Sequence, residues 1–246
     1  MGHEWNGHDE SEVNASVDQI WDAIATGPGI DSWFVGHTEI QSSLGGSMTT
    51  TMATDVMKST VTAWEPLRRF AFRGDEDGTG RFVAYEFLIE GRGQGSAVVH
   101  LVTSGFLPGD DWEAEFDAMT KGNQVFFQTL VAYLNHFAGR TGVSVAVSGP
   151  PVTDWTAAWS TLTTALQLSD RPAIGERATI DLGGESISAV VDFLNTYALG
   201  LRSSDALYRF VQGFNGGMTT DHHLFAPDDQ RRASDVWLAW LTEVYS

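Results

Sequence analysis

Apolar and polar residues alternate with two different periods in the first half of the chain. Apolar side chains follow a helical period from Val17 to Ile24, and Ser16 with Gln19 forms a capping box, so we predict a helix that stops at the glycines of residues 27–29. Before it, residues 4–13 alternate as a polar edge strand does, and several strands punctuated by glycine and proline follow it.

The clearest strand pair joins residues 82–90 to residues 96–103. A turn centred on Gly93 would set Tyr85 opposite Leu101 and Glu86 opposite His100. Both alternating faces are largely apolar, so we expect both to be covered. One face carries Val83, Tyr85, Phe87, Ile89, Val99, Leu101 and Thr103, and the other carries Ala84, Glu86, Leu88, Val98, His100 and Val102. We expect the second face to be covered by the C-terminal domain or a second subunit.

A long amphipathic helix is predicted from about residue 110 to residue 137. Its apolar stripe is spaced by threes and fours, and Asn123 interrupts it. The members of this stripe are Trp112, Phe116, Met119, Phe126, Leu130, Leu134 and Phe137. Burying side chains of this size at roughly 2 kcal/mol each makes the helix the main cover of one sheet face.

The second half of the chain repeats the order of the first half in shorter form. Gly149–Pro150–Pro151 marks a stiff boundary, after which a helix over 154–166, several strands and a terminal amphipathic helix are predicted. We therefore predict an α+β protein with one domain over 1–140 and a smaller α+β domain over 150–246. The second domain is a candidate degenerate copy of the first.

The charge of the chain limits the classes of partner. The 246 residues carry a formal net charge of −18 and no cysteine. Because nucleic acids and anionic lipids are bound through basic contacts, we expect neither nucleic-acid nor membrane partners. Without a visible signal peptide, a cytoplasmic location is expected, as a monomer or a homodimer.

Several segments together resemble a known superfamily. They are residues 13–24, residues 29–34, residues 61–70, Ser104–Gly105–Phe106 and the following helix with Gly122. These resemble the SRPBCC (START-like) proteins, in particular the branch of the activators of the heat-shock-protein-90 ATPase, in an actinobacterial two-domain form. The resemblance implies a helix-grip fold, in which an antiparallel sheet curls around a long C-terminal helix and leaves a cavity between them. The sequence departs from that branch at Thr103, which commonly is His, and at Asn123, which commonly is Trp.

The expected cavity supplies the candidate ligand-binding residues. These are Trp33, Tyr85, Phe87, Thr103, Trp112, Phe116, Asn123 and Phe126. The aromatic side chains could fill the cavity completely, or Asn123 could open it where the related branch has a Trp. The hydroxyls of Tyr85 and Thr103 are either satisfied core groups or, with Asn123, groups that orient a ligand.

Catalytic groups are less well marked. Glu86 beside His100 could act as a carboxylate–imidazole pair, and Tyr85 as an acid, although the register places Glu86 and His100 away from the helix, where a structural pair is the simpler interpretation. We predict no metal, because adjacent His222 and His223 point to opposite faces of a strand and His8 lies on a solvated edge. No cofactor motif occurs, so no cofactor is predicted.

Three functions are compatible with these features. The preferred one is binding of a small, mostly apolar or aromatic molecule in the cavity. The first alternative is a cyclase/dehydratase-type enzyme that acts on a biosynthetic intermediate in the same cavity. The second alternative is a co-chaperone-like protein-interaction module, which would need an exposed apolar patch.

Overall fold

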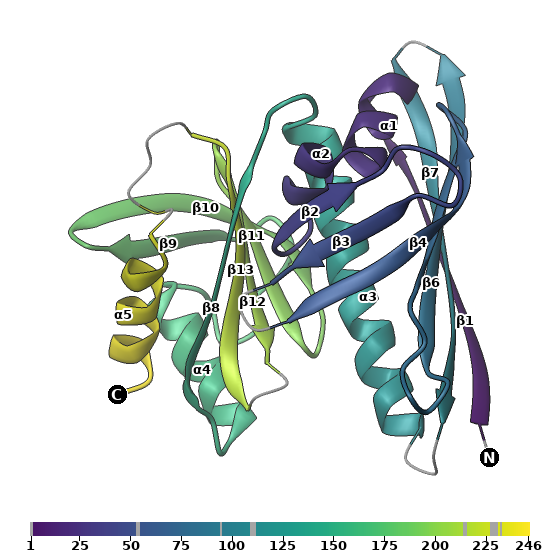
Figure 1. Ribbon diagram of the computed structural model, residues 1–246. Helices are drawn as coiled ribbons and strands as arrows, with labels where there is room; N and C mark the ends of the chain where they lie inside the picture. The colour runs from purple at the N-terminus through teal and green to yellow at the C-terminus, as the bar shows by residue number, and fades with distance from the viewer. Residues whose placement is uncertain are drawn as a thin grey trace. The chain divides into compact units, whose positions relative to one another are not determined.

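The chain forms two compact units, Met1–Thr141 and Gly142–Ser246, shown in Figure 1. The computed structural model describes residues 2–52, 55–93, 95–108, 112–213, 216–226, 231 and 233–246, with only the backbone at 2, 108 and 112–115. Each unit is described by itself.

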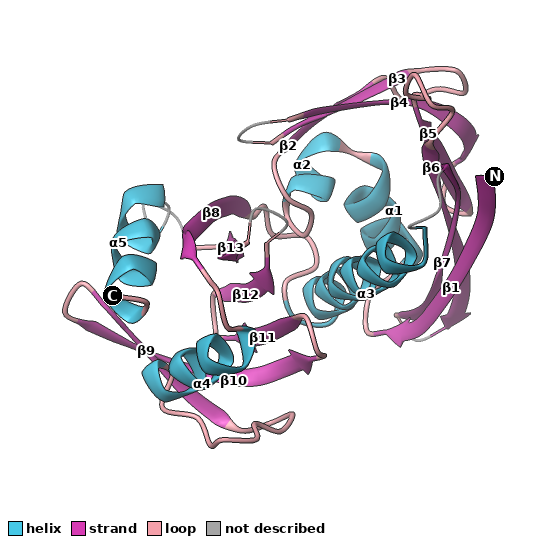
Figure 2. Ribbon diagram, turned by 90° about the horizontal axis from the view of Figure 1, so that it is seen from below, coloured by secondary structure: helices cyan, strands magenta, loops and turns pink. Residues whose placement is uncertain are grey.

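The first unit is a seven-stranded antiparallel sheet with three helices. Its strands are β1 (Gly2–Val13), β2 (His37–Ile40), β3 (Ser47–Thr51), β4 (Val56–Glu65), β5 (Arg69–Gly74), β6 (Phe82–Gly93) and β7 (Ser96–Pro108). Its helices are α1 (Val17–Ala25), α2 (Gly27–Asp31) and α3 (Trp112–His136). The strand order is β1-β7-β6-β5-β4-β3-β2, so the last strand pairs with the first. The sheet curls around the helices in Figure 2, which is the predicted helix-grip arrangement.

Helix α1 begins where the capping box predicts. The Gln19 backbone N–H donates to Ser16 Oγ over 3.2 Å, and the Ser16 N–H donates to Gln19 Oε1 over 2.9 Å. This exchange satisfies two of the backbone donors that a helix N-terminus leaves without intrahelical partners. The helix then buries Ile20, Ile24 and Trp21, and the Trp21 ring packs edge-on against Trp64 with a centroid separation of 5.1 Å.

The hairpin of β6 and β7 exists, but its predicted register is wrong by two residues. Tyr85 lies opposite Thr103, and Glu86 lies opposite Val102 rather than His100. Gly93 pairs with Ser96, so the turn follows Gly93 instead of being centred on it, and a bulge between Gly91 and Gly93 leaves a net shift of two residues. Because the side-chain period of a strand is two, a shift of two residues leaves every side chain on its predicted face.

The outer face of this hairpin carries the second predicted stripe. Val98 is buried there, whereas Ala84, Leu88 and Val102 are half-buried. That a second domain or subunit covers these side chains stays a prediction.

Helix α3 follows the predicted long helix closely. Leu130, Leu134 and Phe137, at the end of the predicted stripe, are buried. The Trp112 side chain, predicted at the start of the stripe, lies outside the described residues.

The second unit has the same pairing scheme with one strand fewer. Its strands are β8 (Val143–Pro151), β9 (Arg177–Leu182), β10 (Glu185–Leu194), β11 (Ala198–Arg202), β12 (Ala206–Gln212) and β13 (Gly217–Leu224), and its helices are α4 (Trp155–Ala165) and α5 (Ser234–Val244). The order β8-β13-β12-β11-β10-β9 again pairs the first strand with the last. Residues 149–151, where a boundary was expected, form the end of β8, and β11 was not predicted.

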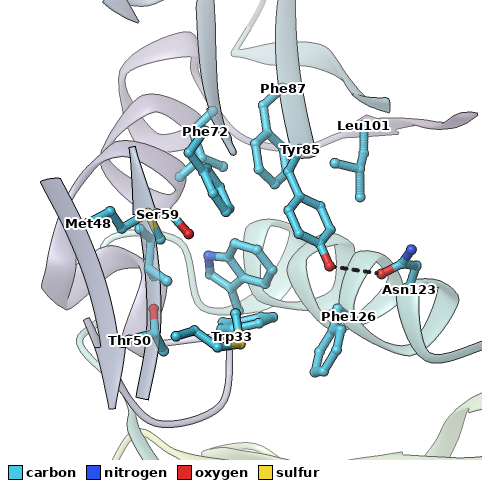
Figure 3. A pocket seen from close by; sticks show the side chains of 14 residues that line it. Trp33, Met48, Thr50, Ser59, Phe72, Tyr85, Phe87, Leu101, Asn123 and Phe126 are labelled. Atoms are coloured by element: carbon cyan, nitrogen blue, oxygen red, sulfur yellow. Dashed lines mark hydrogen bonds between the residues drawn. The ribbon is translucent and has the colours of Figure 1, made fainter. Parts of the chain in front are cut away.

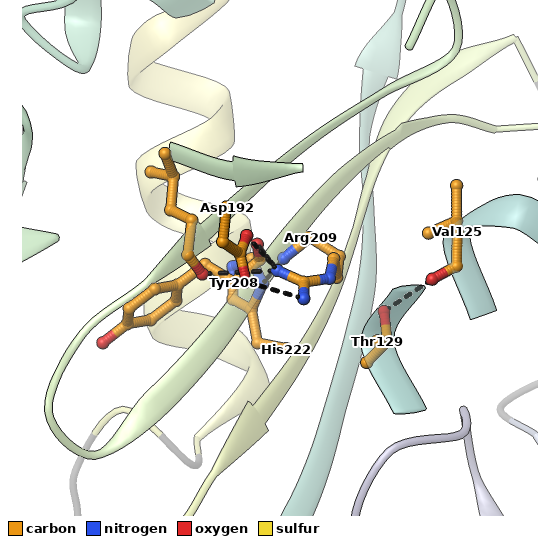
Figure 4. Close-up of polar contacts among 7 residues, drawn as sticks. Val125, Thr129, Asp192, Tyr208, Arg209 and His222 are labelled. Carbon is orange, nitrogen blue, oxygen red and sulfur yellow. Dashed lines mark hydrogen bonds and ion pairs between the residues drawn. The ribbon is translucent and has the colours of Figure 1, made fainter. Parts of the chain in front are cut away.

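The core of the second unit is filled by large side chains. Tyr208, Phe210 and Trp237 surround the ring of His222, whose centroid lies 4.1 Å from that of Trp237. His222 Nδ1 accepts a hydrogen bond from the Arg209 backbone N–H over 3.1 Å, and burial holds the pKa of His222 well below its usual value. His222 is therefore a neutral core residue (Figure 4).

Arg209 is fully buried and forms a two-bond ion pair. Its Nη1 and Nη2 donate to Oδ1 and Oδ2 of Asp192, each over 3.0 Å, as Figure 4 shows. Such a paired geometry compensates part of the cost of removing both charges from water. The unit therefore combines a dense aromatic core with a satisfied buried charge.

Candidate functional site

A cavity lies between α3 and the curled sheet of the first unit. Its lining side chains come from α1, α2 and the loop after it, strands β3 to β7, and α3 (Figure 3). They are Ile24, Ile30, Trp33, Phe34, Met48, Thr50, Met57, Ser59, Phe72, Tyr85, Phe87, Leu101, Asn123 and Phe126. The cavity volume is about 30 Å³, which is room for one or two water molecules.

Two polar side chains meet at one wall of the cavity. The Tyr85 hydroxyl on β6 donates to Oδ1 of Asn123 on α3 over 3.4 Å, drawn as a dashed line in Figure 3. Burial raises the pKa of Tyr85 to about 12. The Tyr85 hydroxyl therefore stays protonated at neutral pH and can act as a hydrogen-bond donor or acceptor, but not as a base.

The opposite wall adds two hydroxyls, Thr50 on β3 and Ser59 on β4. Thr50 Oγ1 already shares a hydrogen bond of 3.1 Å with Thr38 Oγ1. None of the described side chains that line the cavity is charged. Since an ion without a partner is costly to bury, this lining suits an uncharged molecule.

Five of the eight side chains predicted to bind a ligand line this cavity. They are Trp33, Tyr85, Phe87, Asn123 and Phe126. Thr103 is buried and lies opposite Tyr85 in the pairing of β6 with β7. It is on the same face of the sheet as Tyr85, but it does not line the cavity. Phe116 packs edge-on against Trp5 with a centroid separation of 5.9 Å, and Trp112 lies outside the described side chains.

Several lining residues were not predicted, because their strands were not placed relative to the helix. Met48, Thr50 and Ser59 belong to β3 and β4, and their alternation was readable in the sequence. Phe34 directly follows Trp33, and its ring lies 4.6 Å from that of Phe126. The Phe34–Phe126 contact closes one side of the lining.

Glu86 and His100, the predicted acid–base pair, do not meet. Glu86 accepts two hydrogen bonds from Arg69, from Nε over 3.0 Å and from Nη2 over 3.1 Å. His100 instead lies between Glu10, 3.4 Å from Nδ1, and Glu90, 3.6 Å from Nε2. Both residues are on the face of the sheet that points away from the helices, so neither reaches the cavity.

A carboxyl group that the sequence did not single out lies on the helix side. Asp9 on β1 pairs with Leu101, a lining residue, and paired residues in a ladder point to the same face. Burial raises the pKa of Asp9, against the opposing effect of His8. Asp9 is therefore the acidic group to test in any catalytic role of this face.

Residues 5–135 match the family model for polyketide cyclase/dehydrase and lipid transport. The match spans just over half of the chain and most of the first unit. The chain belongs to this family. The SRPBCC character of the resemblance is thereby established, whereas its closer placement among the activators of the heat-shock-protein-90 ATPase stays a prediction. No functionally curated protein matches the sequence.

The fold of this chain resembles solved structures of low sequence identity, among them the following three. The di-domain ARO/CYC protein BexL of the BE-7585A biosynthetic pathway is 11% identical, with 97% of this chain and 98% of that chain covered and a TM-score of 0.49. DynU16, from the dynemicin biosynthetic locus, is 19% identical, with 98% and 97% covered and a TM-score of 0.46. Norcoclaurine synthase from Thalictrum flavum is 17% identical, with 53% and 86% covered and a TM-score of 0.41.

The family description covers both enzymes and transport proteins, so it allows either catalysis or binding.

None of the helices in the described part of the chain is long and apolar enough to span a membrane.

Proposed function

We propose that the first unit binds a small, uncharged, mostly aromatic molecule in the cavity between α3 and the sheet. The observation that carries this proposal is the Tyr85–Asn123 pair, a polar contact in a lining that is otherwise largely apolar. Ligand sites commonly combine apolar walls with a few placed polar groups that fix orientation. A carbonyl or phenol on the ligand would take the place of one partner in this hydrogen bond.

Binding requires the cavity to widen. A volume of about 30 Å³ is far below the roughly 300 Å³ of a small pocket for a drug-sized ligand. The half-buried rings of Phe34 and Phe126 contact each other at the lining, and separating such a pair costs about 0.5–1.5 kcal/mol beyond the loss of buried area. Outward rotation of Phe34 and Phe126 is therefore a low-cost way to admit a ligand.

A cyclase-type reaction is the alternative in the same cavity. Its support is Asp9, whose raised pKa and position beside Leu101 suit a proton donor or acceptor near the ligand. Binding is preferred because the described lining itself contains neither a carboxylate nor an imidazole. In the cyclase alternative Tyr85 would hold the carbonyl and Asp9 would move the proton.

The binding experiment compares three probes of one shape: naphthalene, 2-naphthol and 2-naphthoate. We expect 2-naphthol to bind best, naphthalene more weakly and the anionic 2-naphthoate not measurably, because the lining offers no charge partner. Tyr85→Phe should weaken 2-naphthol by about fivefold and leave naphthalene unchanged, since one hydrogen bond contributes about 1 kcal/mol. Tyr245→Phe, in the second unit, is the matched control.

Two results would overturn binding in this cavity. One is 2-naphthoate affinity equal to that of 2-naphthol. The other is 2-naphthol affinity that Tyr85→Phe does not change.

The cyclase alternative is tested separately with a poly-β-carbonyl thioester, by following loss of water by mass spectrometry. Turnover that is abolished in Asp9→Asn but retained in Asp181→Asn would favour the enzyme.

A further inference from the structure

Strand pairing gathers two histidines and a glutamate on the outer face of the first unit. His8 and Glu10 are two residues apart on β1, so their side chains lie on the same face. Glu10 is directly opposite His100 on β7. This face points away from α3 and the cavity, so the cluster is separate from the site described above.

The donor atoms of the three side chains are close to the spacing of a metal site. One donor atom from each of His8, Glu10 and His100 lies within 4.8 Å of the other two. His100 Nδ1 is 3.4 Å from Glu10 Oε2. In a tetrahedral Zn²⁺ site with bonds of about 2.0–2.1 Å, neighbouring donor atoms are about 3.3 Å apart. That pair already has the required separation, and the exposed His8 side chain needs only to rotate inward.

A fourth residue orients the central histidine. Glu90 on β6 places Oε1 3.6 Å from His100 Nε2, on the side of the ring away from Glu10. His100 is 15% exposed at its side chain, and its Nε2 makes no hydrogen bond within the described part of the chain. Metal-bound histidines commonly donate their second ring N–H to a carboxylate, which fixes the ring and raises its basicity. Glu90 is placed for that role after a small adjustment.

We propose that His8, Glu10 and His100 bind a divalent transition-metal ion of the Zn²⁺ type, with Glu90 as the carboxylate that positions His100. Two imidazoles and one carboxylate form a ligand set that zinc accepts in three-ligand sites, with water in the fourth position. The strong negative charge of the chain favours any cation at its surface. Local motifs in the sequence did not indicate this site, because Glu10 and His100 are 90 residues apart in the chain and only strand pairing brings them together.

The bound ion would hold an edge strand in place. β1 lies at the edge of the sheet and pairs only with β7 among the strands of the first unit. A metal held by two β1 residues and one β7 residue joins these strands by coordinate bonds. Since a ligand that binds only the folded state stabilises it, Zn²⁺ should raise the melting temperature of the protein.

The test is titration of the full chain with Zn²⁺ by calorimetry, after treatment with a chelator, with thermal unfolding alongside. We expect one Zn²⁺ per chain and a higher melting temperature. His8→Ala, Glu10→Gln and His100→Ala should each lower the affinity at least tenfold and remove the thermal shift. Glu90→Gln should lower the affinity about 10- to 100-fold, the range usual for residues that position a metal ligand.

Two control variants separate this site from other sources of binding. His3→Ala removes a histidine of the same strand that belongs to the other face of β1. Glu12→Gln removes a carboxylate on the same face of β1, opposite Val98. Both should bind Zn²⁺ as the unmodified chain does. Absence of one-to-one binding, or an affinity that His8→Ala does not change, would overturn the proposal. Full loss of binding in His3→Ala would also overturn it, because His3 belongs to the other face of β1.

Discussion

The Tyr85 hydroxyl donates to Asn123 Oδ1 over 3.4 Å and so joins the sheet to the long helix across the cavity. Asn123 is 8% exposed, and the side chains around the pair are mostly apolar. This distance is longer than usual for an O–H···O hydrogen bond, so the contact is weak and a ligand group with better geometry could replace it at small cost.

Replacing Asn123 by a bulkier residue should close the cavity. Asn123→Trp adds far more volume than the roughly 30 Å³ that is free, so we expect overpacking to lower the free energy of unfolding by about 1–3 kcal/mol. Binding of 2-naphthol should be lost. Calorimetric titration and urea unfolding measure the two effects. Retained 2-naphthol binding in a folded Asn123→Trp variant would place the ligand elsewhere.

Leu130 anchors α3 to the core of the first unit. Its side chain is 0% exposed, so Leu130→Ala should lower the free energy of unfolding by about 2–5 kcal/mol through lost burial and a new cavity. Gln124→Ala, on the exposed face of the same helix, should change it by no more than about 0.5 kcal/mol. Equal unfolding midpoints for the two variants in urea would show that α3 presents a different face.

Gly105, in the Ser104–Gly105–Phe106 segment of β7, is required by a close approach. A Cβ at Gly105 would lie 2.4 Å from Trp5 Nε1 and 2.7 Å from the Phe82 carbonyl oxygen. Gly105→Ala should therefore destabilise the protein by about 1–3 kcal/mol, because backbone must shift. Gly122 on α3 has open space around it, so Gly122→Ala should stabilise by about 0.5–1 kcal/mol. We expect Gly105→Ala to lower the melting temperature and Gly122→Ala to raise it, each relative to the unmodified chain.

Asp221 in the second unit should make stability depend on pH. Burial raises the pKa of Asp221 to about 7, although Arg209 and a hydrogen bond from Ser144 act in the opposite direction. The folded state thus holds this proton more tightly than the unfolded state, where the pKa is about 3.9. The resulting stability is fully present below about pH 4 and is lost as pH rises towards 7.

The corresponding measurement is urea unfolding at pH 4.5 and pH 7.5. Asp221→Asn should lose less stability than the unmodified chain over this interval, by up to a few kcal/mol. Asp235→Asn, at the exposed start of α5, should follow the unmodified chain. A pH dependence that is identical in Asp221→Asn and the unmodified chain would show that Asp221 is ionised throughout.

Local patterns in the sequence determined much of the first unit. The capping box at Ser16, the hydrophobic period of α3 and the alternation of β6 depend on residues close together in the chain, and all three are present in the structure. The face of the sheet on which Tyr85 and Phe87 lie was also predicted correctly. Side chains of a strand alternate between its two faces, so a register shift of two residues leaves each side chain on the same face.

Tertiary structure alone decided which residues meet. The turn after Gly93 set Glu86 opposite Val102 instead of His100, and the pairing of β1 with β7 placed His100 beside Glu10. The cavity volume likewise depends on how Phe34 and Phe126 pack together from distant segments. Sequence periodicity reports the face on which a side chain lies, whereas contacts between strands and helices depend on register and packing, which are set by the whole chain.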